Sequence, residues 1–256
     1  HNGADNEYMR QRHKALLMPW AGGANVMAYT NKVIALNPIV YFPMAESGGT
    51  VMTDESGNAR DGAYRGVGQP LLAQPGIGDG RTSALFDNSN DFANMYTASL
   101  ATAFNGVAGT VAFWIKVYDV ALWNAACSKR FVAIQVDASN VVQLRKNAAN
   151  TFAWQYIAGG TTKTVTRGSV TDLVWIHIAM TWDKNVDQHK AYWAGSQQGS
   201  TGTGLGTWAG VPASTTTCAG AADTSGNGPW VRYLAHVAVW TTALSAAQIA
   251  TLAVVP

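Results

Sequence analysis

The sequence has few charged residues for its length. Of its 256 residues, 17 are Lys or Arg and 15 are Asp or Glu, so 12% are charged, against about 25% in a typical soluble domain. Helical bundles and coiled coils need surfaces rich in Glu and Lys, so this composition excludes them. The net charge of +2 gives no electrostatic reason to expect nucleic-acid binding.

Glutamate is the scarcest charged residue, with only Glu7, Glu46 and Glu55 in the chain. A retaining glycosidase needs two carboxylates about 5 Å apart, and this sequence supplies few candidates. The chain also has no H-E-x-x-H, no G-x-S-x-G and no P-loop motif, which would indicate other catalytic chemistries. We therefore expect a protein that is not an enzyme, and we name no catalytic residue.

Cysteine and long apolar runs are also scarce. Cys127 and Cys218 allow one disulfide at most, and the sequence leaves open whether they pair and in which redox compartment. No run approaches the roughly 20 mostly apolar residues of a membrane span, so we expect none. Because the chain begins with His1 rather than Met, the sequence indicates that its start was cleaved or lies upstream.

What is present is a regular succession of strand patterns. Apolar residues make up 48% of the chain, which is enough to build a core. Apolar and polar residues alternate in residues 109–117, 175–182 and 233–240, and again on both sides of a turn at residues 137–139. The last pattern predicts a hairpin. Period-two alternation broken by regularly spaced turns is typical of an antiparallel β sandwich.

The alternation assigns faces to the second of these strands. Ile176, Ile178, Met180 and Trp182 share one face, so Trp182 is expected in the core. His177 falls on the opposite face, where we expect a surface or hydrogen-bonded histidine. The region from residue 195 to residue 228 is rich in Gly, Ser, Thr and Ala, and it predicts one or two weak strands among long surface loops.

The two ends of the chain have different patterns. Ser245 and Gln248 form a capping box that predicts a short C-terminal helix ending at Leu252. Residues 1–26 contain a basic, weakly helical stretch and have no core of their own. They are either a solvated extension or an arm that docks on a neighbouring subunit. The residues expected to anchor such an arm are Arg10, Arg12, Lys14 and Trp20.

Five segments in order carry a family pattern. They are NPIVYFPMAESGGTVMTDESGNARDGAY (37–64), ALFDNSNDFANM (84–95), GTVAFWIKV (109–117), WIHIAMTWDKNVDQHKAYWAG (175–195) and YLAHVAVWTTALSAAQIATLA (233–253). Together they resemble the laminin-G-like domains of the concanavalin A-like lectin and glucanase family. The resemblance implies an all-β, two-sheet antiparallel jelly-roll sandwich over residues 27–256, preceded by the arm of residues 1–26.

The sequence departs from the family pattern at several acidic positions. Where the family often has Asp-Glu before its last strand, this chain has Ala235–His236. Two Asp-Gly pairs of the family are replaced by Ala194–Gly195 and Asp87–Asn88. The lost acids weaken any metal site carried over from the family. The glucanase branch takes its carboxylates from an E-x-D-x-E strand, which is absent here, so a glycoside hydrolase is only a remote alternative.

Two predicted turns are rich in the oxygen ligands that calcium prefers. No cofactor is required by the sequence, and calcium is the one candidate. The alternative is that these side chains simply form turns by bonding to their own backbone. The candidate ligands are Asp87, Asn88, Asn90 and Asp91 in one turn and Asp54, Asn58 and Asp61 in the other.

Aromatic residues at loop-like or outward positions are candidates for sugar binding, because an apolar ring face stacks on sugar C–H groups. The alternative is that they are core residues, as most Trp residues of a sandwich are. The candidates are Trp123, Trp154, Tyr156, Trp193, Trp208 and Trp230.

The family resemblance also leads to a functional hypothesis. Domains of this kind occur in structural proteins of tailed bacteriophages and in secreted bacterial proteins, and residues 29–42 resemble the first group more. We therefore predict a non-enzymatic attachment protein of a virion surface, such as a capsid decoration, head fibre or tail protein. Its partners would be other virion subunits or copies of itself in a homo-oligomer, and a cell-surface glycan. The alternative is a secreted, extracellular carbohydrate-binding module.

Overall fold

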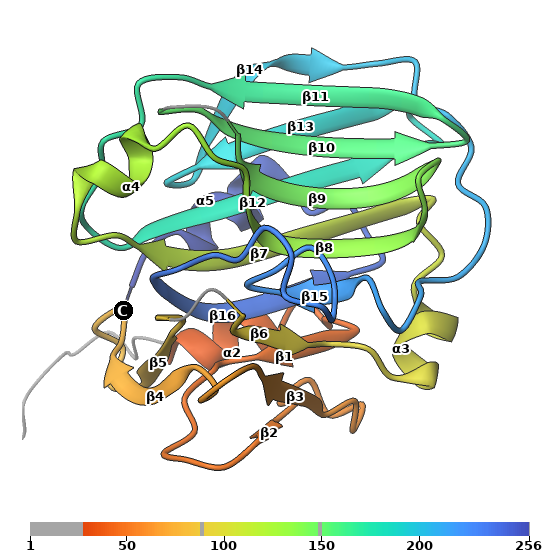
Figure 1. Ribbon diagram of the computed structural model, residues 1–256. Coiled ribbons are helices and arrows are strands. Elements are labelled where there is room, and N and C mark those ends of the chain that lie inside the picture. The colour runs from red at the N-terminus through yellow and green to blue at the C-terminus, as the bar shows by residue number, and fades with distance from the viewer. Residues whose placement is uncertain (1–27, 88–89, 148–149, 256) are drawn as a thin grey trace, which may run out of the picture.

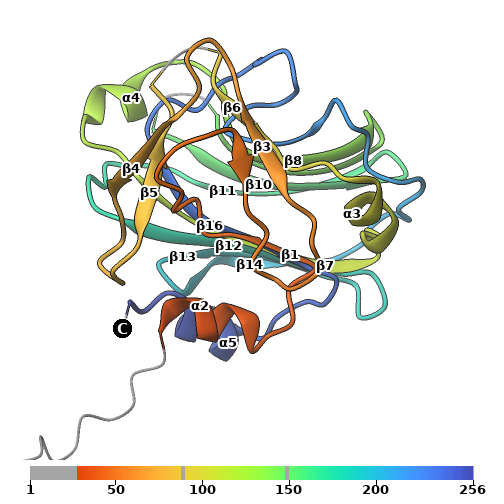
Figure 2. The same ribbon diagram turned by 90° about the horizontal axis from the view of Figure 1, so that it is seen from below.

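The protein is a sandwich of two antiparallel β-sheets, seen from the side in Figure 1 and from below in Figure 2. The computed structural model describes residues 28–87, 90–147 and 150–255. The all-β jelly-roll prediction is confirmed. The predicted arm, with Arg10, Arg12, Lys14 and Trp20, lies outside the described residues.

The first sheet, sheet A, has eight strands, seven of them in one path. Its central strand β7 pairs with β12 on one side and with β16 on the other. In path order the strands are β14 (Ser196–Gly202), β13 (Gln188–Trp193), β12 (Ile176–Asp183), β7 (Ala108–Lys116), β16 (Tyr233–Trp240), β5 (Thr82–Leu85) and β4 (Leu71–Pro75), and β1 (Val40–Phe42) also pairs with β16.

The second sheet, sheet B, also has eight strands. Strands β8 and β9 form the predicted hairpin, in which the Asp137 carboxylate accepts a hydrogen bond of 2.8 Å from the Ser139 amide. In path order the strands are β11 (Thr161–Arg167), β10 (Phe152–Ala158), β9 (Asn140–Lys146), β8 (Lys129–Asp137), β15 (Thr217–Ala219), β6 (Phe92–Asn94), β3 (Gly62–Arg65) and β2 (Val51–Met52).

In the described part of the chain, four short helices lie around the sandwich: α2 (Tyr29–Ile34), α3 (Ala98–Ala103), α4 (Val120–Asn124) and α5 (Ala246–Leu252). The C-terminal helix α5 begins at the predicted capping box. The Ser245 hydroxyl accepts from the Gln248 amide, and the Gln248 side chain accepts from the Ser245 amide. Because both exchanges satisfy amides that lack a helical partner, the box fixes where α5 begins.

The main core lies between the two sheets and follows the period-two pattern. On β7, Val111, Phe113 and Ile115 point into it. On β12, Ile178, Met180 and Trp182 do the same, so Trp182 is a core residue as predicted. The alternation therefore decided which face of each strand is buried.

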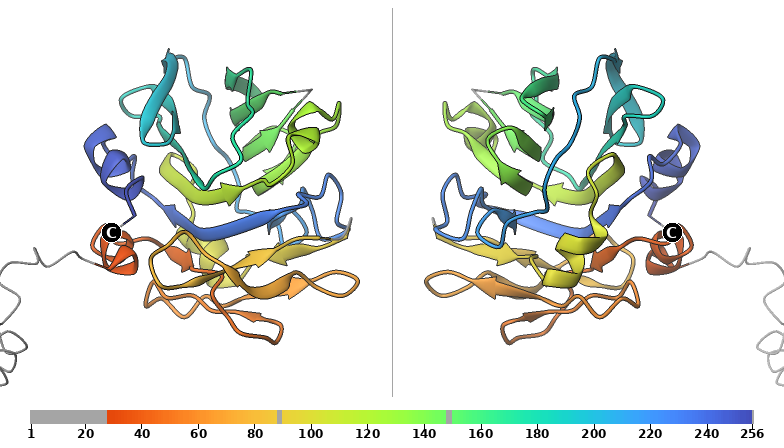
Figure 3. Two further views of the ribbon diagram at one scale, coloured as in Figure 1. Left: turned by 90° about the vertical axis from the view of Figure 1, so that its left-hand side faces the viewer. Right: turned by 90° about the vertical axis from the view of Figure 1, so that its right-hand side faces the viewer.

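A second, smaller core lies on the outer face of sheet A. Helices α2 and α5 lie next to each other on the outer side of this sheet, below it in Figure 2 and beside it in Figure 3. Trp114, Ala179 and Trp240 point outward from the sheet and contact residues of the two helices. His177 shares this face and is only 1% exposed. The expectation of a surface histidine is wrong, because the helices turn this face into a second interior.

The region from residue 195 to residue 228 contains two strands, as predicted. Strand β14 forms the edge of sheet A, but β15 is not peripheral. It lies between β8 and β6 inside sheet B, with Cys218 directly opposite Ala133. A three-residue strand with weak sequence signals therefore joins the two halves of sheet B.

Candidate functional site

The six aromatic residues predicted to bind a ligand are buried in the main core. Their exposed fractions run from 0% to 7%, and none presents a ring face to solvent. The prediction that they lie at outward positions is wrong. The six residues are Trp123, Trp154, Tyr156, Trp193, Trp208 and Trp230.

Their contacts explain why the core holds so much aromatic surface. The ring of Trp154 lies 4.4 Å from that of Phe152 and 6.2 Å from that of Trp193, measured between centroids. The polar atoms of several rings bond to backbone oxygens: Trp123 Nε1 donates to Asp172, and the Tyr156 hydroxyl donates to Gly106, both at 2.9 Å. These side chains fill the core between the two sheets and do not form a binding surface.

The first predicted calcium turn is organised by Asp54. Its Oδ1 accepts hydrogen bonds from the Tyr41 and Ser56 amides, both at 2.9 Å. Its Oδ2 accepts from the Ser56 hydroxyl and the Arg60 amide, also at 2.9 Å. Asp61 accepts from the Asp54 amide at 2.8 Å. Each Asp54 oxygen already has two donors, so the hydrogen bonds favour the turn-forming alternative here.

Asn58 also favours the turn-forming alternative, because its side chain donates hydrogen bonds in this turn. Its Nδ2 bonds to the Pro38 and Ile39 carbonyls at 3.2 and 3.3 Å. It thereby ties the turn to the start of strand β1.

Replacing Asp54 with Asn is expected to lower the stability by about 1–3 kcal/mol, since an amide nitrogen cannot accept the two bonds now made to Oδ2. EDTA is expected to change the melting temperatures of the wild-type protein and of Asp54→Asn by the same amount. Differential scanning fluorimetry of both proteins, with calcium and with EDTA, checks this. A melting temperature that falls in EDTA for the wild type but not for Asp54→Asn would show that Asp54 binds calcium.

The second predicted calcium turn is described only in part, because Asn88 lies outside the described residues. Asp91 is fully buried, and its Oδ2 accepts a hydrogen bond of 3.3 Å from the Asp87 amide. A Cβ atom added to Gly226 would lie 3.1 Å from the Asn90 Cα, so the two backbone segments pass close to each other. Among residues 28–87, 90–147 and 150–255, no three His, Cys, Asp or Glu residues group closely enough to hold a metal ion. Calcium at this turn stays a prediction.

Two glutamates line a cavity of about 190 Å³ at one end of the sandwich. The Glu46 carboxylate accepts from the Tyr64 hydroxyl and from the Thr53 amide, both at 2.7 Å. Glu55 forms an ion pair of 2.7 Å with Arg81. Both carboxylates are therefore engaged by hydrogen bonds or an ion pair. Neither is free to act as the general acid or the nucleophile of glycoside hydrolysis.

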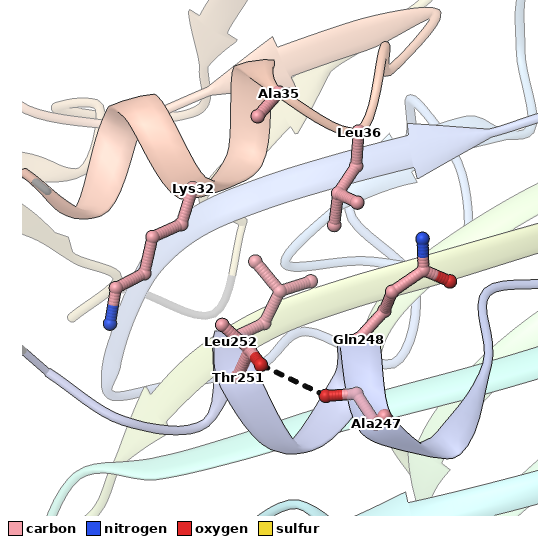
Figure 4. A pocket seen from close by; sticks show the side chains of 7 residues that line it. All are labelled: Lys32, Ala35, Leu36, Ala247, Gln248, Thr251 and Leu252. Atoms are coloured by element: carbon pink, nitrogen blue, oxygen red, sulfur yellow. Dashed lines mark hydrogen bonds between the residues drawn. The ribbon is translucent and has the colours of Figure 1, made fainter.

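A larger cavity of about 430 Å³ separates helix α2 from helix α5 (Figure 4). The side chains of Leu36 and Leu252 point toward each other across it. The Lys32 ammonium lies at its edge and donates to the Val254 carbonyl at 3.0 Å. Because its walls are mainly aliphatic, this cavity does not suit a polyhydroxylated ligand.

The outer face of sheet B carries a polar row across strands β9, β10 and β11. Gln143 is the register partner of Gln155, which is in turn the partner of Thr164. The Gln143 Nε2 donates to the Gln155 Oε1, and the Gln155 Nε2 donates to the Thr164 Oγ1 at 3.1 Å. We call these three residues the polar row. None of the helices in the described residues covers it (Figure 1), in contrast to the outer face of sheet A.

Two arginines lie next to the polar row on the same face. Arg130 of β8 and Arg145 of β9 are register partners. Burial, together with the charge of Arg145, lowers the pKa of Arg130 to about 10, and burial also lowers the pKa of Arg145. This part of sheet B is therefore both polar and positively charged.

Neither a disulfide nor a membrane-spanning helix is part of the structure described. Cys127 and Cys218 are both free thiols, and burial raises the pKa of Cys218 to about 12. Within the part of the chain that the structure describes, no helix is both long and apolar enough to cross a membrane.

Solved structures with this fold come from several kinds of protein. The binding domain of botulinum neurotoxin serotype D is 13% identical with a TM-score of 0.58, covering 85% of this chain and 51% of its own. Domain 4 of an extracellular arabinanase from Geobacillus stearothermophilus, in complex with arabinotriose, is 14% identical with a TM-score of 0.61. That match covers 85% of this chain and 98% of the arabinanase domain.

A sialidase from Trypanosoma rangeli is also similar, at 12% identity and a TM-score of 0.56, over 84% of this chain and 32% of the sialidase. This chain spans about half the length of the neurotoxin domains that it matches. At such identities the likeness shows the fold alone. No sequence among curated proteins matches this chain.

The sequence itself matches a family model. The model is described as the concanavalin A-like lectin/glucanases superfamily, and it matches residues 87–250. The matched range runs from the turn before β6 to helix α5, so it contains the strands that form the polar row and the arginine pair. With the two-sheet architecture, this match identifies the chain as a member of the concanavalin A-like lectin and glucanase superfamily.

Proposed function

We propose that this chain is a non-catalytic carbohydrate-binding module that binds its ligand on the outer face of sheet B. The observation that carries the proposal is the polar row, because it holds amide and hydroxyl groups in fixed positions on an uncovered sheet. Side-chain amides and hydroxyls both donate and accept hydrogen bonds, so the polar row can bond to the hydroxyl groups of a sugar.

The chemistry of the acidic residues supports binding without catalysis. Glu46 and Glu55, the glutamates that the structure describes, are held by Tyr64 and Arg81. The fold occurs in a domain solved with arabinotriose and also within a sialidase, so the fold alone does not separate a binding module from a part of an enzyme. The partners of the two glutamates favour the binding module.

The proposal also includes the attachment role that the sequence predicts. We infer a module displayed on a bacteriophage virion, where residues 1–26 would anchor it to other subunits or to a second copy. The resemblance of residues 29–42 to phage structural proteins supports this. Size-exclusion chromatography with light scattering, on the full chain and on residues 27–256, tests the anchor. An oligomer that persists without residues 1–26 would show that they do not anchor it.

The full chain is expected to bind at least one class of oligosaccharide on a glycan array that includes arabinotriose. Replacing Gln155 with Ala should then weaken binding about fivefold or more, because the substitution removes both the donor and the acceptor at the centre of the row. Gln197→Ala is the matched control, since Gln197 is exposed on β14 of sheet A and bonds only within its own turn. Equal losses in the two variants, or no binding to any glycan by the folded protein, would contradict the proposal.

A further inference from the structure

Two like charges lie directly opposite each other on neighbouring strands of sheet B. Arg130 and Arg145 are register partners on β8 and β9, and both point away from the main core. Directly opposite residues of an antiparallel pair have Cβ atoms about 4.5–5.5 Å apart, and like charges there repel. The two side chains therefore start from neighbouring positions on a half-buried surface, and the charge of Arg145 acts on Arg130.

Neither arginine has a carboxylate partner among the residues that the structure describes. The ion pairs found there join Arg81 to Glu55 and His236 to Asp79. Arg130 donates to the Ser128 hydroxyl, and the Nε of Arg145 is buried without a hydrogen-bond partner. Burial lowers the pKa of both groups, and for Arg130 the charge of Arg145 adds to it. Partly buried cations without a counter-charge are costly to a fold, and an anion bound between them would remove that cost.

The arginine pair is continuous with the polar row. Gln143 precedes Arg145 by two residues on β9, so both side chains point to the same face, about 7 Å apart along the strand. The pair of Arg130 and Arg145 lies two residues along the strands from the row, and Ala153 of β10 is the register partner of Arg145. A ligand with an acidic group on the arginines would therefore extend its hydroxyl groups over Gln143 and Gln155.

We propose that Arg130 and Arg145 form a subsite for the anionic group of an acidic saccharide, a carboxylate or a sulfate. Guanidinium groups bind such planar or tetrahedral oxyanions through paired N–H···O bonds. This inference rests on the proposed carbohydrate-binding function and narrows its ligand to acidic sugars. It does not depend on a catalytic group or on a metal ion.

Isothermal titration calorimetry of the full chain tests the subsite with three probes of matched length. The probes are trigalacturonate, a sulfated galactotriose and uncharged galactotriose. We expect at least one acidic probe to bind about tenfold or more tightly than the uncharged one, with affinity falling as salt rises. The probe that binds best distinguishes a carboxylate from a sulfate ligand.

Arg145→Gln and Arg130→Gln should each lower the affinity for the acidic probe about tenfold or more, and leave that for the uncharged probe unchanged. Arg65→Gln is the control, because Arg65 is an exposed arginine on β3 of the same sheet, several strands away. The melting temperature of Arg145→Gln should not fall, since the substitution removes a repulsion. A purely structural arginine would instead lower the melting temperature.

A thermal-shift assay with free galacturonate and with sulfate separates this inference from the proposed function. Stabilisation by either anion in the wild type, absent in Arg145→Gln, supports the subsite even if no oligosaccharide binds. If all three oligosaccharides bind equally well and Arg145→Gln changes nothing, the subsite is wrong while carbohydrate binding stands. If neither anion stabilises the protein and none of the acidic probes binds, the subsite is wrong; if no glycan on the array binds either, both proposals are wrong.

Discussion

Replacing Trp154 with Ala is expected to lower the free energy of unfolding by about 3–5 kcal/mol, a large share of the roughly 5–15 kcal/mol typical of a domain. Trp154 is fully buried, and its ring packs on those of Phe152 and Trp193. Removing it leaves a cavity that the two sheets cannot close, because each is held by its own hydrogen-bond ladder. Chemical denaturation followed by circular dichroism measures the loss.

The neighbouring residue gives a matched control. Gln155 follows Trp154 on β10 and points to the opposite face. Gln155→Ala should cost about 1 kcal/mol or less and reduce glycan affinity, whereas Trp154→Ala should reduce stability and leave the affinity of the folded fraction unchanged. If Trp154→Ala instead abolished glycan binding without lowering the free energy of unfolding, Trp154 would be a ligand-binding residue.

The main features of the fold were predictable from local patterns. The alternation in residues 109–117, 175–182 and 233–240 corresponds to β7, β12 and β16, which are neighbours in sheet A. The turn at residues 137–139 joins β8 to β9, and the capping box begins α5. These predictions succeeded because each depends on residues close together in the sequence, where period-two burial and capping chemistry act.

The candidate site was less predictable, because the sequence does not show what covers the second face of a strand. Trp114 alternates away from the main core, yet it lies in a second one together with residues of α2 and α5. His177 shares this face, is buried and packs on the Trp114 ring. From the sequence, Trp154 and Tyr156 are expected at loop-like or outward positions, but both share the inward parity of Phe152 on β10. The period-two alternation of β10, like that of β12, is the sequence signal that places them in the core.

The residues that now form the candidate site carried a weaker signal. Gln143 and Arg145 alternate with Val142 and Leu144 on β9, so their outward direction could be read from the sequence. Their grouping with Gln155 and Arg130 could not, because it depends on the register of β9 against β8 and β10. Register is set by long-range pairing, and a shift of one residue would move all of these side chains to the other face.

Acidification from pH 7 to pH 5 is expected to destabilise the protein by about 4 kcal/mol through two buried histidines. Burial lowers the pKa of His177 to about 3, with a smaller effect from His236. Burial also lowers the pKa of His189 to about 4, with a smaller effect from Lys163. In the unfolded chain each imidazole has a pKa near 6.5.

The sign follows from which state binds the proton. Below about pH 6.5 the unfolded chain takes up a proton at each histidine, while the folded protein does not until pH 4 or 3. Acid therefore favours unfolding throughout this window. At pH 5, about 1.5 pH units below the unfolded pKa, each histidine contributes about 2 kcal/mol of destabilisation at 1.36 kcal/mol per unit. The stability is regained as the pH rises through 6.5.

Urea denaturation at pH 7, 6 and 5 measures this slope, and His177→Leu is the variant that isolates one histidine. Neither ring nitrogen of His177 has a hydrogen-bond partner within the described part of the chain, so leucine removes a titrating group without leaving a new unsatisfied one. The variant should match or exceed the wild type at pH 7 and exceed it by about 2 kcal/mol at pH 5. If the unfolding free energy of His177→Leu instead changed with pH as that of the wild type does, His177 would be protonated inside the fold. The outer face of sheet A would then open to water, because burying a charged imidazole without a partner is too costly.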